Sequence, residues 1–342
     1  MQVMLGLLAV GSVFLTAACS PTTPDVTPTD ETPTATDTPT ETDTPSPTPT
    51  LNAEKQTLTS FSAISVTGDF NTAPTVTAPY PFNVDKSLCE TTITGTGIAV
   101  GDASVVELQY TGINGSDGQT FDTSFSTGQT LLGQNGYFVT GFNNCLTGAK
   151  VGSRVVMLVS GPDGYDSQGG QSDAGIAVGD TLLFVVDIIA AEYTHPDGQH
   201  LADGNQWANV TDKDGVPTIT LVPGVTAPTE LQSTVLTQGT GRAVATGDAV
   251  YVNFIQMDLA TGEIIQNSYT DGGGPQADLL ANLIPGWRES LVGQTMGSRL
   301  LLVVPGSMAY PQGNASPSVT PNATLVFVVD ILFSWVPQQQ SS

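Results

Sequence analysis

The chain of 342 residues is longer than one ordinary domain and suits two domains of about 100–150 residues with tails. Its 8 Lys and Arg against 32 Asp and Glu give a formal charge of -24, which argues against nucleic acid as a partner because phosphates need basic contacts. Charged residues are only 12% of the chain, and its 37 Gly and 23 Pro favour turn-rich antiparallel sheet over helical bundles. Beyond this, the charge indicates no more than an acidic secreted protein.

The N-terminus resembles an export signal that ends in a lipidation site. An apolar run over residues 5–15 is too short to span a bilayer. Small residues then lead to Cys19, the arrangement of a bacterial lipobox, where the signal is cut before a cysteine whose sulfur is acylated. Thr16 stands where an aliphatic residue is usual. We predict a lipoprotein signal peptide over 1–19 with lipid on Cys19; the alternative is an unlipidated signal peptide.

Residues 20–51 consist mainly of Thr, Pro and acidic residues and have almost nothing to bury. Such a segment cannot offset its ordering entropy, so we expect a disordered, extended tether. At ~3.1 Å per residue it reaches up to ~90 Å. We therefore expect an exported protein anchored to the outer face of the cytoplasmic membrane, which it contacts through the lipid alone.

A repeat of about 144 residues organises the rest of the chain. The segments 94–97, 105–110, 151–154 and 181–188 return in order at 238–241, 249–254, 296–299 and 324–331. The strand-like segments alternate apolar and polar residues with period two, which is typical of half-buried strands. We predict two copies of one fold, copy one over residues 52–191 and copy two over 192–337, with a tail at 338–342.

Within each copy we expect one short helix among antiparallel strands, which is an α+β arrangement. Asp117-Gly118 is a hairpin signal between two strands. The helix candidates are residues 140–146 and 285–292, and Pro285 suits a first helical turn.

The sequence offers no motif for a metal or a cofactor, and we predict neither. The only histidines, His195 and His200, lie between the copies with no cysteine nearby. A nucleophile elbow, a phosphate loop and a dinucleotide fingerprint are all missing from the sequence. Catalysis by this chain would therefore have to proceed without a covalent nucleophile.

Copy one contains a series of motifs in a fixed order: Tyr110-Thr111-Gly112, residues 117–124, Val139 to Phe142, Val151 to Arg154, Gly164-Tyr165 and Thr181 to Phe184. In their order and spacing, these segments resemble the FKBP family of peptidyl-prolyl isomerases. The resemblance implies two tandem domains, each a twisted antiparallel sheet wrapped around one short helix. It also implies a shallow pocket for a prolyl ring between sheet and helix.

The resemblance implies a specific set of pocket residues in copy one. They are Tyr110, Phe121, Val139, Phe142, Tyr165, Ile176 and Phe184, with Asp122 at the rim. Tyr165 would donate a hydrogen bond to a substrate carbonyl, and Phe142 takes the place of the family's usual Trp. Taken alone, each aromatic is better explained by core packing, but the ordered set favours a pocket. For Asp122 the alternative is a solvated turn carboxylate.

Copy two departs from the family pattern at the rim of its pocket. The resemblance implies a second pocket of Phe254, Ile284, Trp287, Tyr310 and Phe327. Phe254 replaces the tyrosine, however, and Ile265-Gln266 replaces Phe-Asp. We predict a weak or inactive module that still binds apolar or prolyl segments.

With Cys19 assigned to lipid, Cys89 and Cys145 remain as a pair in an oxidising compartment. In the family fold the helix packs against the sheet, which implies that the two cysteines come close enough for a disulfide. The alternative is two buried free thiols.

The resemblance implies an isomerase that assists the folding of exported proteins. Its expected partners are proline-containing exported polypeptides and the macrolide inhibitors of the family. The alternative function is a non-catalytic chaperone or binding lipoprotein that retains the fold.

Overall fold

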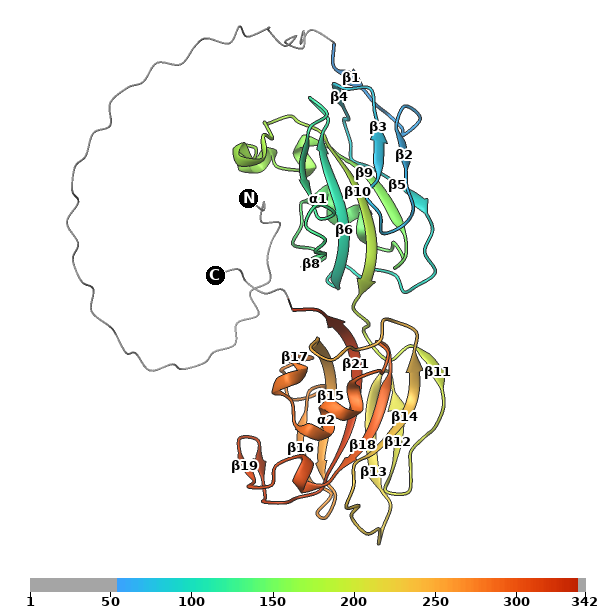
Figure 1. The fold of residues 1–342 in the computed structure, drawn as a ribbon, viewed down its shortest axis with the longest axis vertical. Helices are drawn as coiled ribbons and strands as arrows, with labels where there is room; N and C mark the ends of the chain where they lie inside the picture. Colours follow the sequence, from blue (N-terminus) through green and yellow to red (C-terminus); the bar gives the residue numbers. More distant parts are fainter. Residues whose placement is uncertain (1–53, 338–342) are drawn as a thin grey trace, which may run out of the picture. The chain divides into compact units, whose positions relative to one another are not determined.

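The computed structural model describes residues 54–337. The predicted signal peptide, Cys19, the tether and the tail lie outside these residues. Two antiparallel sheets of related topology, one in each copy, are the largest elements of the described chain (Figure 1). No helix among residues 54–337 is both long enough and apolar enough to cross a membrane.

The first sheet has the strand order β5-β9-β10-β6-β7, and β8 also pairs with β6. Its strands are β5 Leu88–Ile93, β6 Val105–Asn114, β7 Thr120–Thr123, β8 Leu131–Gln134, β9 Arg154–Val159 and β10 Leu182–Ala191. The predicted Asp117-Gly118 turn joins β6 to β7, and Gly118 adopts a positive φ of 76° there.

The second sheet repeats this order as β11-β14-β18-β21-β15-β16, with β17 pairing with β15. Its strands are β11 Gly198–His200, β14 Gln232–Gly239, β15 Ala249–Asp258, β16 Ile264–Asn267, β17 Gln276–Leu279, β18 Arg299–Val304 and β21 Leu325–Trp335. The register also repeats: Gly112 faces Phe184 and Asp122 across neighbouring strands, and Gln256 faces Phe327 and Gln266.

Each copy has the short helix that its sequence predicts. Helix α1 covers Thr140–Leu146, and helix α2 covers Pro285–Leu291, one residue shorter than expected. A glycine lets each helix lie close to a central strand: a Cβ on Gly141 would come within 2.7 Å of Val159, and one on Gly286 within 2.4 Å of Val304. The remaining helical turns are 3₁₀ segments: η1 Gly161–Asp163, η2 Asp166–Gln168, η3 Ser172–Ala174, η4 Leu280–Asn282 and η5 Gly306–Met308.

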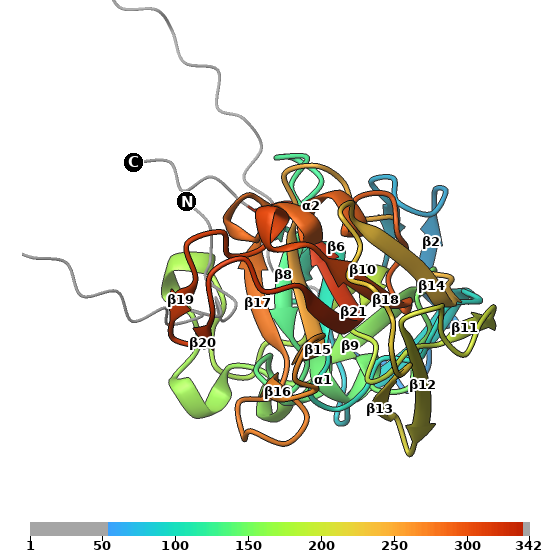
Figure 2. The same cartoon turned by 90° about the horizontal axis from the view of Figure 1, so that it is seen from below.

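A layer that the sequence analysis did not predict covers the other face of each sheet. In copy one it contains the parallel pair β1 Gln56–Thr57 and β4 Phe82–Asn83, and the hairpin β2 Ser65–Thr67 with β3 Thr75–Thr77. In copy two it is the hairpin β12 Ala208–Lys213 with β13 Val216–Leu221, away from α2 in both views (Figures 1 and 2). A further small hairpin joins β19 Asn314–Ala315 to β20 Ser318–Val319.

Because of these layers, each sheet buries both faces. In copy one, Phe142 and Phe184 belong to the core on the helix side, whereas Phe82 and Leu158 belong to a second core on the other side. In copy two, Trp207 belongs to the corresponding rear core. The apolar residues of both predicted pockets belong to the core on the helix side or pack against it.

A buried arginine ties the rear layer to the sheet in each copy. In copy one, Arg154 binds Asp187 with Nε–Oδ1 of 2.6 Å, and both side chains are 1% exposed. The same guanidinium donates to the carbonyl oxygens of Gly68, Asp69 and Thr72, in the loop between β2 and β3. Such charge-assisted bonds hold the loop against the sheet.

In copy two, Arg299 repeats this arrangement. Its guanidinium binds Asp330 and also donates to Asp212, near the end of β12, and to the Gly215 carbonyl, in the turn between β12 and β13. Burial alone would raise the pKa of Asp212, but the hydrogen bonds from Arg299 and from the Gly215 amide, together with the positive charge of Arg299, outweigh burial and lower that pKa.

Candidate functional site

The structure brings the eight predicted residues of copy one together on the helix side of the first sheet. Strands β6, β7 and β10, the start of α1 and the loop after β9 supply them: Tyr110, Phe121, Asp122, Val139, Phe142, Tyr165, Ile176 and Phe184. The apolar and aromatic members all belong to one hydrophobic cluster, or pack directly against it.

Edge-to-face aromatic contacts organise the floor of this site. The ring of Phe184 lies 5.6 Å from Phe121 at 90° and 5.1 Å from Phe142 at 89°, the geometry that the ring quadrupoles prefer. The sequence analysis missed Phe138, which lies 5.0 Å from Phe142 and is also buried. Its signal was an aromatic residue two positions before the start of the helix. Phe142 and Phe184 are fully buried, so these two rings are core residues.

A hydrogen bond joins Tyr110 to Asp122 at the edge of the site. The Tyr110 hydroxyl donates to the Asp122 carboxylate, so Asp122 has a specific partner rather than water alone. Burial, and then the Asp122 carboxylate, raise the pKa of Tyr110 well above its ordinary value. Tyr110 is 4% exposed, and Asp122 therefore fixes a buried ring in place.

Tyr165 offers the hydrogen-bond donor that the resemblance implies. Its hydroxyl has no hydrogen-bond partner among the described residues, although the side chain is only 8% exposed. Burial, and then the negative charge of Asp122, raise the pKa of Tyr165, so the hydroxyl keeps its proton at neutral pH. Such a group can donate to a carbonyl oxygen entering the site.

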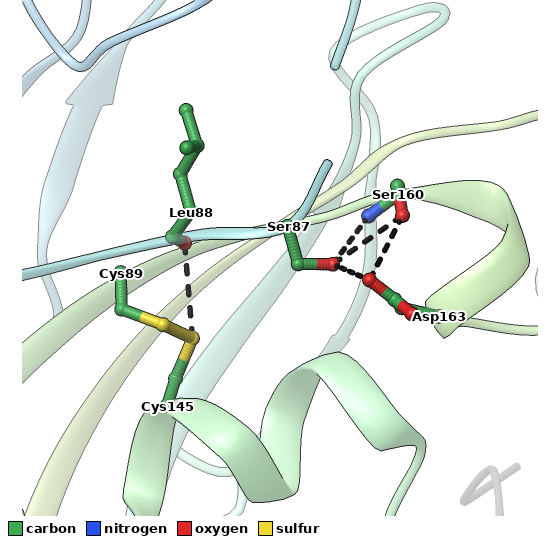
Figure 3. The surroundings of a disulfide bond; sticks show 6 residues. All are labelled: Ser87, Leu88, Cys89, Cys145, Ser160 and Asp163. Atoms are coloured by element: carbon green, nitrogen blue, oxygen red, sulfur yellow. Dashed lines mark hydrogen bonds between the residues drawn. A yellow bond between two sulfur atoms is a disulfide. The ribbon is translucent and has the colours of Figure 1, made fainter. Parts of the chain in front are cut away.

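A polar cluster that the sequence analysis missed supports the loop carrying Tyr165. The Asp163 carboxylate accepts hydrogen bonds from Ser87 at 2.6 Å and from Ser160 at 3.2 Å (Figure 3). The Ser87 hydroxyl also accepts from the Ser160 amide. These bonds join the segment before β5 to the start of the loop, two residues before Tyr165. No motif in the sequence links Ser87 to the other two residues, because it is more than 70 residues away from both.

The disulfide lies beside this cluster (Figure 3). Cys89 of β5 and Cys145 of α1 are bonded, with their Cα atoms 5.5 Å apart. This pairing agrees with the predicted one and differs from the alternative of two free thiols. The bond ties α1, whose start carries Val139 and Phe142, to the edge strand of the sheet.

In copy two, all five predicted residues line one cavity of about 290 Å³. The ring of Trp287 meets Phe254 at 5.2 Å and Phe327 at 5.4 Å, both nearly edge-to-face. Gln256, Gln266 and further polar residues also line the cavity. Copy two, whose rim residues depart from the family pattern, thus has a cavity with an aromatic floor.

Comparison with known proteins identifies this fold and site. Residues 97–189 and 240–332 each match the family of FKBP-type peptidyl-prolyl cis-trans isomerases, and together they are more than half of the chain. The chain belongs to this family. It has two tandem FKBP domains, as the sequence analysis predicted for fold and family, and the residues of both predicted pockets lie within the matched ranges.

Individual relatives match one FKBP domain at a time. FkpA of Escherichia coli K12, an FKBP-type peptidyl-prolyl cis-trans isomerase, is 38% identical over 107 residues, which are 31% of this chain and 38% of FkpA. A probable FK506-binding protein of Corynebacterium glutamicum is 34% identical over 107 residues, 31% of this chain and 88% of that protein. This chain therefore spans less than two thirds of FkpA.

A solved structure of FkpA from Escherichia coli covers 34% of this chain and 54% of that chain at 36% identity, with a TM-score of 0.30. The assignment to the FKBP family rests on the sequence matches over the two domains.

Proposed function

We propose that the first FKBP domain is a peptidyl-prolyl cis-trans isomerase, and that the second is a binding module with little or no turnover. The observation that carries this proposal is the set of polar groups around the first pocket. Tyr110 and Asp122 are hydrogen-bonded to each other, and the Tyr165 hydroxyl is left as a donor. The second domain has Phe254 and Gln266 in place of the first pair.

The chemistry of X-Pro isomerisation suits such a site. Rotation about the peptide bond has a barrier of ~18–20 kcal/mol because resonance gives the bond double-bond character. A pocket of buried rings excludes water and favours the twisted amide, which is less polar than the planar one. The Tyr165 hydroxyl holds a carbonyl of the bound segment, while Asp122 keeps the Tyr110 ring in position. No bond to a nucleophile is needed.

The natural substrates on this proposal are proline-containing polypeptides outside the cytoplasm. The lipobox-like run before Cys19 and the Thr/Pro-rich segment after it support this location. The isomerase would then act at the outer face of the membrane on chains that fold after export.

A matched pair of variants in the full chain tests the assignment. Tyr165→Phe removes the proposed donor in the first domain, and Tyr310→Phe removes the corresponding hydroxyl in the second. We expect kcat/KM for a proline-containing test peptide to fall with Tyr165→Phe and to stay unchanged with Tyr310→Phe. An equal loss with both variants would contradict the assignment. A wild-type chain that binds the peptide without accelerating isomerisation would instead favour the non-catalytic chaperone.

A further inference from the structure

Two buried hydrogen-bond donors on residues that line the cavity of the second domain have no partner among the described residues. Gln256 is 1% exposed and Trp287 is 6% exposed, and both line the cavity. Neither Nε2 of Gln256 nor Nε1 of Trp287 forms a hydrogen bond within the described part of the chain. A buried donor without a partner destabilises the folded chain by about 1–3 kcal/mol. A ligand that accepts a hydrogen bond from the donor would remove this destabilisation.

Gln256 fits there because a neighbouring side chain is smaller than in the first domain. At the same register position the first domain has Gly112, and a Cβ on it would come within 2.5 Å of the Phe121 ring. The second domain has Ile265 in place of that ring. The exchange of Gly and Phe for Gln and Ile therefore replaces an aromatic wall by an amide.

The lining also defines the charge that a ligand can have. It contains no Lys, Arg or His, but includes Asp278 and the neutral amides of Gln266, Gln276 and Asn282. A carboxylate would have to enter this cavity without a cationic partner, in a chain of formal charge -24. The ligand that matches is uncharged, has an apolar body and offers oxygen acceptors to two separate donors.

We propose that the second domain binds a short, uncharged peptide segment through two backbone carbonyl oxygens, one accepting from Gln256 and one from Trp287. An aliphatic side chain of the segment fills the apolar part between Phe254 and Phe327, and a proline is not required. The cavity of about 290 Å³ is near the lower end of small-molecule sites and suits a dipeptide unit. The peptide nature of the ligand rests on the proposed function, in which the chain handles polypeptides.

Indole N–H signals in the ¹⁵N-labelled full chain test this proposal. The chain has three Trp, none of them in the first domain, and Trp207 already donates to the Thr226 carbonyl at 2.9 Å. The probes are blocked acetyl-Ala-Leu-amide and acetyl-Ala-Pro-amide. We expect the Leu probe to move the Trp287 indole signal downfield, with the Trp207 and Trp335 signals unchanged as internal references.

Three variants separate the donors from the fold. Gln256→Met and Trp287→Phe should each weaken binding of the Leu probe by about 3- to 10-fold, the effect of one neutral hydrogen bond. Binding to Trp287→Phe is followed by the backbone amide signals of residues 254–256. Tyr165→Phe changes the first domain and should leave the affinity of the second domain for the Leu probe unchanged. Loss of isomerase activity can therefore be distinguished from loss of this binding.

Other outcomes would overturn the proposal. They are an unmoved Trp287 signal, wild-type affinity in a folded Gln256→Met chain, or binding restricted to the proline probe. Tighter binding of the free acid acetyl-Ala-Leu would also reject the expected charge.

Discussion

Asp122 illustrates how the structure changes the reading of a single residue. The sequence analysis placed it at the rim of a pocket, with a solvated turn carboxylate as the alternative. In the structure it is half-buried and accepts a hydrogen bond from a tyrosine that is 4% exposed. Asp122 is therefore a positioning residue for the Tyr110 ring, and its removal acts on stability as well as on rate.

The first prediction separates these two effects at Asp122. Asp122→Ala leaves the Tyr110 hydroxyl buried without an acceptor, so we expect a stability loss of about 1–3 kcal/mol and a lower kcat/KM. Asp122→Asn keeps an acceptor oxygen and should lose less of both. Urea unfolding at pH 7 and a peptide isomerisation assay measure the two quantities. Gln266→Ala, at the same register position in the second domain, is the matched control and should leave kcat/KM unchanged. If Asp122→Asn loses as much stability and activity as Asp122→Ala does, the hydrogen bond to Tyr110 is not the cause of the losses.

The second prediction concerns alkaline pH. The pKa of Tyr110 lies above its ordinary value of 10.0, so the folded state favours the neutral phenol. This contribution to stability is fully present below pH 10 and is lost as pH rises from there through the pKa of the folded protein. We expect Tyr110→Phe to show a smaller decline in unfolding free energy above pH 10 than wild type. Tyr137→Phe, at a site that is 72% exposed, should decline as wild type does.

At the scale of elements, the sheets, both helices and the pocket residues could be predicted from sequence. Period-two alternation marked the strands, and a repeat with family spacing placed the helices within one residue. The rear layers were missed because the sequence analysis assigned no strands to residues 54–84 or 208–221. One signal was available: Arg154–Val159 and Arg299–Val304 are continuous apolar runs after their arginines, as expected for strands covered on both faces.

A turn signal for the second rear layer was also present. Asp214-Gly215 lies between β12 and β13, and both residues have positive φ, 54° and 83°. Asp-Gly between two β-rich segments is a strong hairpin indicator. The polar cluster of Ser87, Ser160 and Asp163 could not be found in this way, because it depends on how distant segments meet in three dimensions.

The third prediction tests the arginine that ties the rear hairpin to the first sheet. Arg154→Met leaves Asp187 buried without its partner, and we expect a loss of about 3–5 kcal/mol in urea unfolding. The double variant Arg154→Met with Asp187→Leu removes both charges and should recover part of that loss. Lys150→Met, which removes an exposed cation nearby in sequence, should change stability little. A double variant no more stable than the single one would show that the unpaired charge is not the cause.

At the scale of the whole molecule, the two copies retain one scaffold and differ at their pockets. The helix glycine, the buried arginine with its aspartate, and the rear hairpin occur in both. The changes gather where a ligand would enter, at Gly112 and Gln256 and at Asp122 and Gln266. Such a distribution is expected when stability is required of both domains and the chemistry of only one.

The fourth prediction concerns the anchor. If Cys19 carries lipid, the mature protein should fractionate with membranes, and Cys19→Ser should move it to the soluble fraction or leave it with its signal attached. One acyl chain binds a membrane only marginally, so we expect more than one chain at the new N-terminus. Mass spectrometry of the N-terminal peptide measures this directly. Unchanged fractionation of Cys19→Ser would reject the lipid.

The disulfide has a consequence for the order in which the two halves mature. Both of its cysteines belong to the first domain, and the sequence of the second domain contains none. The cytosol keeps thiols reduced, whereas oxidants act on them outside it. If the chain is exported as we propose, the second domain can complete its covalent structure anywhere, whereas the first would complete it only after export. The half that we propose to be the enzyme would then mature only at the place where we propose that it works.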